Sequence, residues 1–125
     1  MTVSKNLFNL AKSPLGDVIV GLAFGKLSKL LPVKRILETD KVIAFWHPKP
    51  FWEKHILIVP KKAIKNITSL TDQDLPYIDE VFRVTKDLVV EFGWDVKDYS
   101  LLANGGDSQK VHQLHFHLHS GEELE

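Results

Sequence analysis

The sequence predicts an α+β domain with a five-stranded, mostly antiparallel sheet and two helices. Two segments repeat apolar residues at helical spacing, and several short runs rich in β-branched and aromatic residues lie between turn signals. The C-terminal run 109–119 alternates apolar residues with histidines, which is typical of a strand. The chain has 125 residues. We therefore expect one domain over residues 1–125, which buries about two-thirds of its unfolded surface.

The first helix is predicted to begin at Ser13 and Pro14, where an N-cap residue precedes a proline at the first helical position. Apolar residues then recur at helical spacing, and Pro32 marks the end. This apolar face comprises Leu15, Val18, Ile19, Leu22, Ala23, Leu27 and Leu30. We expect an amphipathic helix whose apolar face packs in the core.

Three short runs predict the first three strands. Residues 33–38 and 41–46 are joined by a hairpin turn at residues 39–40, and a loop with two prolines follows. Residues 55–59 are apolar almost throughout, which favours a central strand that ends at Pro60.

The second helix is predicted between Thr71 and Gly93. Thr71 and Asp74 have capping-box spacing, acidic residues fill the first turn, and Gly93 supplies a stop. The apolar face comprises Leu75, Ile78, Val81, Phe82, Thr85, Leu88, Val89 and Phe92. This spacing predicts a long helix packed on the sheet.

The last two strands are predicted at residues 99–103 and 109–119, with a turn at residues 104–107 between them. Successive side chains of a strand point to opposite faces, so three histidines share one face of the last strand. Imidazole changes charge near neutral pH and serves as a base, a nucleophile or a metal ligand. The residues on this predicted functional face are Gln113, His115, His117 and His119.

The composition argues against some partners. Lys and Arg number 16, as do Asp and Glu, so the formal net charge is zero. A nucleic-acid or anionic-membrane footprint needs a basic excess, so we expect neither partner. The chain has no cysteine, which excludes disulfides, thiol nucleophiles and thiolate-bound zinc. No apolar run approaches the ~20 residues of a membrane span, and we expect a cytoplasmic protein.

The histidines allow three interpretations. Alternating histidines on a strand can bind zinc, with His55 or His47 completing the site, although no carboxylate signature accompanies them. They can also be surface residues without chemistry. The third interpretation is covalent catalysis on a phosphate ester or phosphoramidate, because a neutral imidazole can attack phosphorus directly. The glycine-rich segment 104–106 and a second histidine can then donate N–H groups to the phosphate oxygens.

Two blocks of sequence carry a family resemblance. Residues 109–111 read Gln-Lys-Val, and residues 113–119 read Gln-Leu-His-Phe-His-Leu-His. An upstream block begins at Phe24 and ends with residues 55–62. These blocks resemble the histidine triad (HIT) family of nucleotide-binding hydrolases and transferases, and most closely its purine-nucleoside phosphoramidase branch. The family signature is His-φ-His-φ-His-φ-φ after Gln-x-Val, where φ is apolar, so Gln113 stands at the first histidine.

The resemblance implies a HIT-like fold and roles for individual residues. His115 stands at the nucleophile position, which forms a nucleotidyl-histidine intermediate, and His117 stands at a phosphate-contacting position. His55 matches the fourth family histidine, which supports the triad from the neighbouring strand. Positions that contact the phosphate or ribose are matched by Asn104, Lys110 and Val111. Positions in the wall of the base pocket, which also suit a core, are matched by Phe24, Leu27, Phe45 and Pro48.

Three features depart from the family pattern. Gln113 can bridge to His55 or orient His115 by hydrogen bonds, but it cannot titrate. His47, which we also expect to bind the nucleotide, stands where an aspartate usually holds the ribose hydroxyls. The chain ends shortly after Gly121, so we expect the leaving-group side of the pocket to be open.

The resemblance therefore implies a hydrolase that cleaves a phosphoramidate or phosphoanhydride bond at the α-phosphate of a purine nucleotide. It implies a homodimer that pairs sheets across the helix at residues 72–92, and it implies no metal or organic cofactor. The alternative is a nucleotide-binding sensor or partner module with little or no catalysis. The expected catalytic residues are His115, His117, His55 and Gln113.

Overall fold

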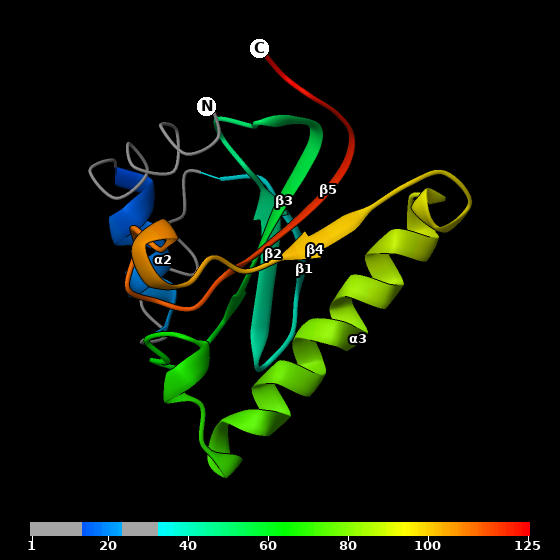
Figure 1. Cartoon of the computed structure of the whole chain (residues 1–125). Coiled ribbons are helices and arrows are strands. Elements are labelled where there is room, and N and C mark those ends of the chain that lie inside the picture. The colour runs from blue at the N-terminus through cyan, green and yellow to red at the C-terminus, as the bar shows by residue number, and fades with distance from the viewer. Residues whose placement is uncertain (1–13, 24–32) are drawn as a thin grey trace.

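The computed structural model describes residues 14–23 and 33–125. Five strands form one antiparallel sheet in the order β1-β2-β3-β5-β4, which confirms the predicted α+β class. Helices α2 (Pro14–Ala23) and α3 (Leu75–Glu91) lie on opposite sides of this sheet (Figure 1). The strands are β1 (Arg35–Glu38), β2 (Val42–Trp46), β3 (Trp52–Pro60), β4 (Ser100–Leu102) and β5 (Phe116–Glu123).

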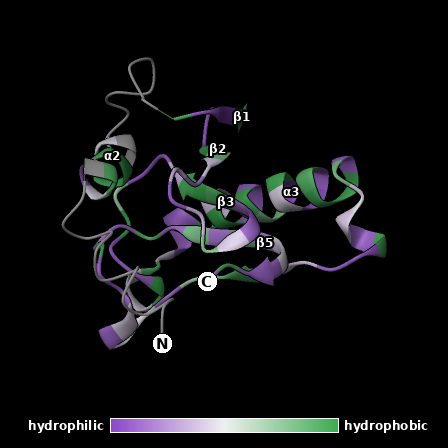
Figure 2. Cartoon of the chain, turned by 90° about the horizontal axis from the view of Figure 1, so that it is seen from above, coloured by the Kyte–Doolittle hydropathy of each residue, from purple (hydrophilic) through white to green (hydrophobic). Residues whose placement is uncertain are grey.

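Alternation along the strands divides the core into two clusters. On β2, Val42 and Ala44 belong to the cluster under α3, whereas Ile43 and Phe45 belong to the cluster under α2. The central strand β3 divides in the same way. Seen from above, the strands lie between the two helices (Figure 2). Burial of both faces explains why residues 56–60 of β3 are all apolar, as the predicted central position requires.

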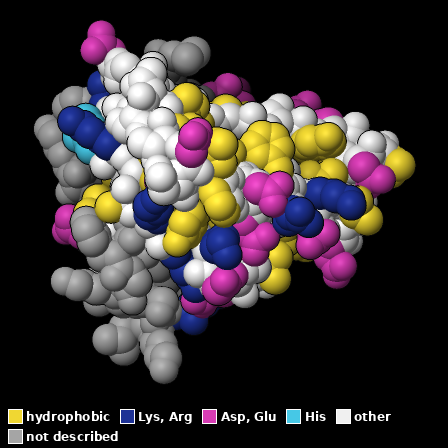
Figure 3. Space-filling model, turned by 90° about the horizontal axis from the view of Figure 1, so that it is seen from below, with side chains coloured by type: hydrophobic (Ala, Val, Ile, Leu, Met, Phe, Trp, Pro, Cys, Tyr) yellow, Lys and Arg dark blue, Asp and Glu magenta, His cyan; other side chains and the backbone are white. Residues whose placement is uncertain are grey.

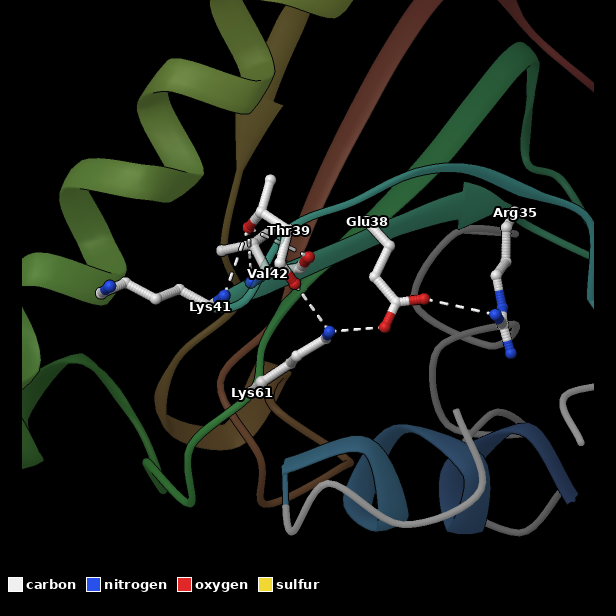
Figure 4. Close-up of polar contacts among 6 residues, drawn as sticks. All are labelled: Arg35, Glu38, Thr39, Lys41, Val42 and Lys61. Atoms are coloured by element: carbon white, nitrogen blue, oxygen red, sulfur yellow. Dashed lines mark hydrogen bonds and ion pairs between the residues drawn. The ribbon is translucent and has the colours of Figure 1, made fainter. Parts of the chain in front are cut away.

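The predicted hairpin between β1 and β2 is confirmed, and Lys61 ties it to the end of β3 (Figure 4). The Thr39 N–H donates to the Val42 carbonyl at 2.8 Å and closes the turn. Lys61 Nζ donates to the Thr39 carbonyl at 2.6 Å and forms an ion pair with Glu38. Glu38 also accepts from Arg35 at 3.2 Å. One cation therefore holds the turn and the neighbouring strand together.

The predicted end of α3 at Gly93 is confirmed, whereas its start is three residues later than the predicted cap at Thr71 implies. A 3₁₀ turn at Asp72–Asp74 leads into it, and the Thr71 N–H donates to the Asp74 carboxylate at 2.9 Å. Lys62 forms an ion pair with the same carboxylate. Gly93 ends the helix with a φ of 70°, a left-handed conformation that glycine adopts without strain.

The predicted apolar face of α3 is wrong in part. The residues that the helix buries are Val81, Val84, Thr85, Leu88 and Val89. Leu75 and Phe82, which were predicted to be on this face, are 52% and 57% exposed. Val90 is 59% exposed. Steps of seven or eight residues return to one side of a helix, so these three form a second apolar stripe that faces solvent.

The predicted first helix is confirmed from Pro14 to Ala23, and its expected continuation at residues 24–32 lies outside the described residues. Within residues 14–23 and 33–125, no helix has the length and apolar character needed to cross a bilayer.

The predicted last strand is wrong at its start, because β5 begins at Phe116 and runs on to Glu123. Residues 109–115 form a loop instead. The expected tight turn at residues 104–107 is part of a longer connection that contains a 3₁₀ turn at Gly106–Ser108. β3 ends at Pro60, and among the described residues no strand pairs with residues 109–115, although the Leu114 N–H donates to the Ile64 carbonyl at 2.7 Å.

Glutamine side chains hold this loop in place of a strand ladder. Gln113 Nε2 donates to the Lys62 carbonyl at 2.8 Å, and Gln113 Oε1 accepts from the Ile64 N–H at 3.2 Å. Gln109 Nε2 donates in the same way to the Lys65 carbonyl at 2.7 Å. The Gln113 amide is therefore bound to main-chain groups and makes no bridge to His55, one of the two contacts expected for it.

We predict that Gln113→Met destabilises this loop, because methionine has a similar length but leaves the Ile64 N–H and the Lys62 carbonyl unpaired. Each buried main-chain group left unpaired costs about 1–3 kcal/mol. Denaturant unfolding measures the loss, and hydrogen exchange should show faster exchange of the Ile64 amide. The matched control is Gln73→Met on the exposed 3₁₀ turn, which should change stability by less than about 0.5 kcal/mol. Equal effects of the two substitutions would contradict the prediction.

Candidate active site

Five histidines converge on the α2 side of the sheet. The register of β3 and β5 sets His55 opposite His119 and Leu57 opposite His117. His47 follows β2, and His115 precedes β5. Neighbouring ring centroids lie 4.4–6.4 Å apart. We call these five residues, His47, His55, His115, His117 and His119, the imidazole cluster.

A main-chain hydrogen bond fixes the protonation of His115. The Nδ1 of this ring lies 2.7 Å from the Gln113 carbonyl oxygen. A carbonyl oxygen can only accept, so Nδ1 carries the proton and Nε2 carries the lone pair. The expected orienting role of Gln113 toward His115 is therefore met by its main chain and not by its amide.

His55 and His117 form a directed pair. The Phe51 N–H donates to His55 Nδ1 at 3.1 Å, so a neutral His55 carries its proton on Nε2. That nitrogen lies 2.8 Å from His117 Nδ1 and donates to it. The proton of His117 is therefore on Nε2, a buried atom that has no hydrogen-bond partner among the described residues.

His47 lies against this pair. Its ring stacks on His55 with a centroid distance of 4.4 Å and an interplanar angle of 25°. The Lys49 N–H donates to His47 Nδ1 at 3.0 Å, which places the proton of the neutral ring on Nε2. Like that of His117, this buried Nε2 has no partner among the described residues.

Trp52 packs against the imidazole cluster beside His119 and His55. Its ring stacks on His119 with a centroid distance of 3.7 Å and an interplanar angle of 1°, and it meets His55 edge-on at 5.1 Å. Sequence reasoning missed this residue. Its only signal was an aromatic side chain three positions before His55, at the start of the strand that carries the cluster.

Burial lowers the pKa of every ring in the cluster, because desolvation penalises the imidazolium. Desolvation lowers the pKa of His47 to about 4, with His115 as the second cause. It lowers the pKa of His55 to about 2, with His47 and His119 as further causes. The pKa of His117 falls well below its ordinary value for the same reason. Desolvation also lowers the pKa of His115 and of His119, against the opposing effects of the Gln113 carbonyl and of Asp98.

This arrangement suits an attack on phosphorus better than the other two interpretations. His115 offers a lone pair on Nε2, and two neighbouring rings offer unpaired N–H donors. The rings are too buried for surface residues without a role. Metal binding is disfavoured, because His55 Nε2 and His117 Nδ1 face each other. Among residues 14–23 and 33–125, no three His, Cys, Asp or Glu side chains are placed to hold a metal ion.

The remaining predicted site residues are spread around the cluster. Asn104 and Lys110 are half-buried in the loop between β4 and β5, and Val111 is buried. Phe45 is fully buried in the same core cluster as Val111, whereas Pro48 is exposed. Two predicted base-pocket residues, Phe24 and Leu27, lie outside the described residues.

Comparisons with known proteins agree on the family. The HIT domain family model matches residues 29–124. An uncharacterized HIT-like protein of Helicobacter pylori is 32% identical over 95 residues, which cover 74% of this chain and 88% of that protein. The structure of a HIT family hydrolase from Legionella pneumophila matches with a TM-score of 0.73 at 26% sequence identity. The matched region covers 86% of this chain and 95% of the Legionella chain.

A histidine triad nucleotide-binding protein from Candida albicans also matches, with a TM-score of 0.63 at 27% identity. The match covers 74% of this chain and 68% of that one. The family match spans most of the sequence and includes all five histidines of the imidazole cluster. The chain belongs to the HIT family.

Proposed function

We propose that this protein binds a purine nucleotide and cleaves the phosphoramidate or phosphoanhydride bond at its α-phosphate, as in the phosphoramidase branch. The proposal depends on one observation, the position of the proton on the His115 ring. The Gln113 carbonyl holds the proton of His115 on Nδ1, and burial keeps the ring neutral. His115 Nε2 is therefore an available nucleophile at pH 7.

The reaction has two steps. His115 Nε2 forms a bond to the α-phosphorus, and the bond from phosphorus to the leaving amine or phosphate breaks. The leaving group departs with the electron pair and takes up a proton. Water then attacks the nucleotidyl-histidine, the bond to Nε2 breaks, and the nucleoside monophosphate and a proton are released.

The other residues of the site bind and position the substrate in this proposal. His117 Nε2–H is unpaired among the described residues and is suited to a non-bridging oxygen, while His55 holds the ring of His117. The family resemblance supports phosphate or ribose contacts for Asn104, Lys110 and Val111. It supports a base pocket that includes Phe24, Leu27, Phe45 and Pro48. The relatives from Legionella and Candida, named a hydrolase and a nucleotide-binding protein, support the same class of function.

A nucleotide-binding sensor or partner module is the second candidate. The observation that favours it is Gln113, which has no titratable proton and whose amide is occupied by main-chain groups. Gln113 therefore cannot act as an acid or base in the reaction. Binding of a nucleotide without any release of the leaving group would identify the module.

We predict that the wild-type protein releases amine from an adenosine phosphoramidate in a burst and traps nucleotidyl-protein. Rapid mixing measures the burst, and mass spectrometry of the quenched protein measures the adduct. His115→Ala should abolish both, because it removes the attacking nitrogen. The matched control is His112→Ala, an exposed histidine three residues away, which should leave both unchanged. An adduct that persists in His115→Ala would refute the assigned nucleophile.

We also predict that the free energy of unfolding falls as the pH is lowered from 7 to 5. The unfolded chain takes up protons on these histidines below about pH 6.5, whereas His47 and His55, with folded pKa values of about 4 and about 2, stay neutral down to pH 5. The unfolded state then binds more protons, so stability rises with pH and is lost below the unfolded pKa. His47, with its folded pKa of about 4, accounts for about 1.4 kcal/mol per pH unit.

Denaturant unfolding at several pH values measures this slope. His47→Asn should reduce it by about one proton. A free energy of unfolding that is flat between pH 7 and 5 would show that the cluster is protonated in the folded state.

We further propose a homodimer that pairs sheets across α3, as the family resemblance implies. Support comes from the exposed apolar stripe of Leu75, Phe82 and Val90, and from the edge position of β4 in the sheet. On the face seen from below, apolar side chains lie among acidic and basic ones (Figure 3).

Sedimentation velocity tests the dimer. Phe82→Glu places a charge in the stripe and should convert the dimer to monomer at micromolar concentration. Val20→Glu is the control, because Val20 is a similarly apolar, exposed residue on the opposite side of the sheet. A wild-type protein that sediments as a monomer would refute the proposal.

A further inference from the structure

His47 carries a hydrogen-bond donor that the proposed reaction leaves unused. Among the buried side-chain nitrogen and oxygen atoms of residues 14–23 and 33–125, two have no partner, His47 Nε2 and His117 Nε2. In the proposed reaction the second of these binds the phosphate. His47 is only 5% exposed, so bulk water does not satisfy its donor. Buried donors without a partner are rare and costly, which indicates that a ligand supplies the acceptor.

The other nitrogen of His47 decides what the ring can bind. The Lys49 N–H occupies Nδ1 at 3.0 Å, and the neutral ring therefore offers one donor at Nε2 and no acceptor. An oxygen that only accepts, such as a phosphate oxygen, matches this ring. A sugar hydroxyl matches it less well, because its own proton needs an acceptor that His47 cannot provide.

The two rings that carry these donors lie close together. The rings of His47 and His117 are nearly parallel, with an interplanar angle of 26° and a centroid distance of 6.3 Å. Hydrogen bonds to charged oxygens are roughly 2.7–2.9 Å long, so two such bonds and the width of a phosphate span this separation. His115 lies beside His117, with ring centroids 5.2 Å apart. The nucleophile and both donors therefore belong to one site.

We infer that His47 Nε2–H binds a non-bridging oxygen of the reacting phosphate, so that two neutral imidazoles, His47 and His117, hold the phosphate together. This inference rests on the proposed function for the identity of the anion. It assigns His47 a phosphate contact in place of the ribose contact that the family resemblance implies at this position. Fixed N–H donors in a buried site strengthen as negative charge develops on the phosphate oxygens.

Two substitutions of His47 distinguish the role of its Nε2–H donor from that of the hydrogen bond that its Nδ1 accepts from Lys49. In His47→Asn, the amide oxygen can still accept from the Lys49 N–H, but the side chain is too short to donate where Nε2 does. In His47→Gln, the longer amide can donate near the position of Nε2. Thermal unfolding of both full-length variants checks that they fold.

Titration calorimetry at pH 7 compares inorganic phosphate with adenosine, which has no phosphate. His47→Asn should weaken phosphate binding roughly tenfold or more, the effect of one lost hydrogen bond to a charged group. His47→Gln should keep the phosphate affinity within roughly threefold of wild type. Adenosine should bind all three proteins equally. In the wild type, phosphate should also shift the ¹⁵N and ¹H resonances of the His47 Nε2–H.

Two results would overturn the inference. One is a phosphate affinity of His47→Asn equal to that of wild type, with no shift of the His47 resonances. The other is a loss of adenosine binding as large as the loss of phosphate binding, which would place a sugar at His47. Both results are independent of the nucleotidyl adduct on His115. Adduct formation without a phosphate effect at His47 would overturn this inference alone, and the reverse pattern would overturn the proposed function alone.

Discussion

The hydrogen bond from His115 Nδ1–H to the Gln113 carbonyl is the constraint on which the rest of the site depends. It decides which ring nitrogen holds the lone pair, and it works only if the Gln113 main chain is fixed. The Gln113 amide fixes it by bonding the Lys62 carbonyl and the Ile64 N–H. Lys62 is held in turn by its ion pair with Asp74 at the start of α3. The orientation of His115, the proposed nucleophile, is thus coupled to the packing of the helix on the far side of the sheet.

Burial gives the cluster its chemistry. The alternation of β5 turns Phe116 and Leu118 toward α3 and leaves His117 and His119 on the α2 side, beside buried aliphatic residues of β3. Desolvation there keeps the imidazoles neutral, so the site holds donors and a lone pair without net charge. A cluster of imidazolium ions would attract phosphate more strongly but would have no nucleophile. The neutral cluster depends instead on directed N–H groups.

Short-range sequence patterns predicted the parts of the fold that depend on neighbouring residues alone. The Thr71–Asp74 cap, the Gly93 stop and the two faces of the histidine segment follow from short-range rules of capping and alternation. The loop at residues 109–115 did not, because it is held by glutamine side chains and by one main-chain hydrogen bond, from Leu114 to Ile64, that all reach a distant segment. The His55–His117 pair and the stacked His47 depend on the register of β2, β3 and β5, which spacing along the chain does not encode. Leu75 and Phe82 were predicted to lie in the core because they are apolar and fit the helical spacing, although they face solvent.

Gln113 has two roles, one for its main-chain carbonyl and one for its side-chain amide. Its carbonyl orients His115 whatever the side chain is, since any residue at this position has a carbonyl. Its amide secures the loop with one donor and one acceptor that keep their character at every pH. An imidazole at this position would lose its acceptor on protonation, and the acceptor is what binds the Ile64 N–H. Glutamine therefore holds the loop and the ring of His115 in place over a wider range of pH than histidine would, but it has no proton to contribute to the proposed reaction. In that reaction the proton of the leaving group comes from another member of the cluster or from water.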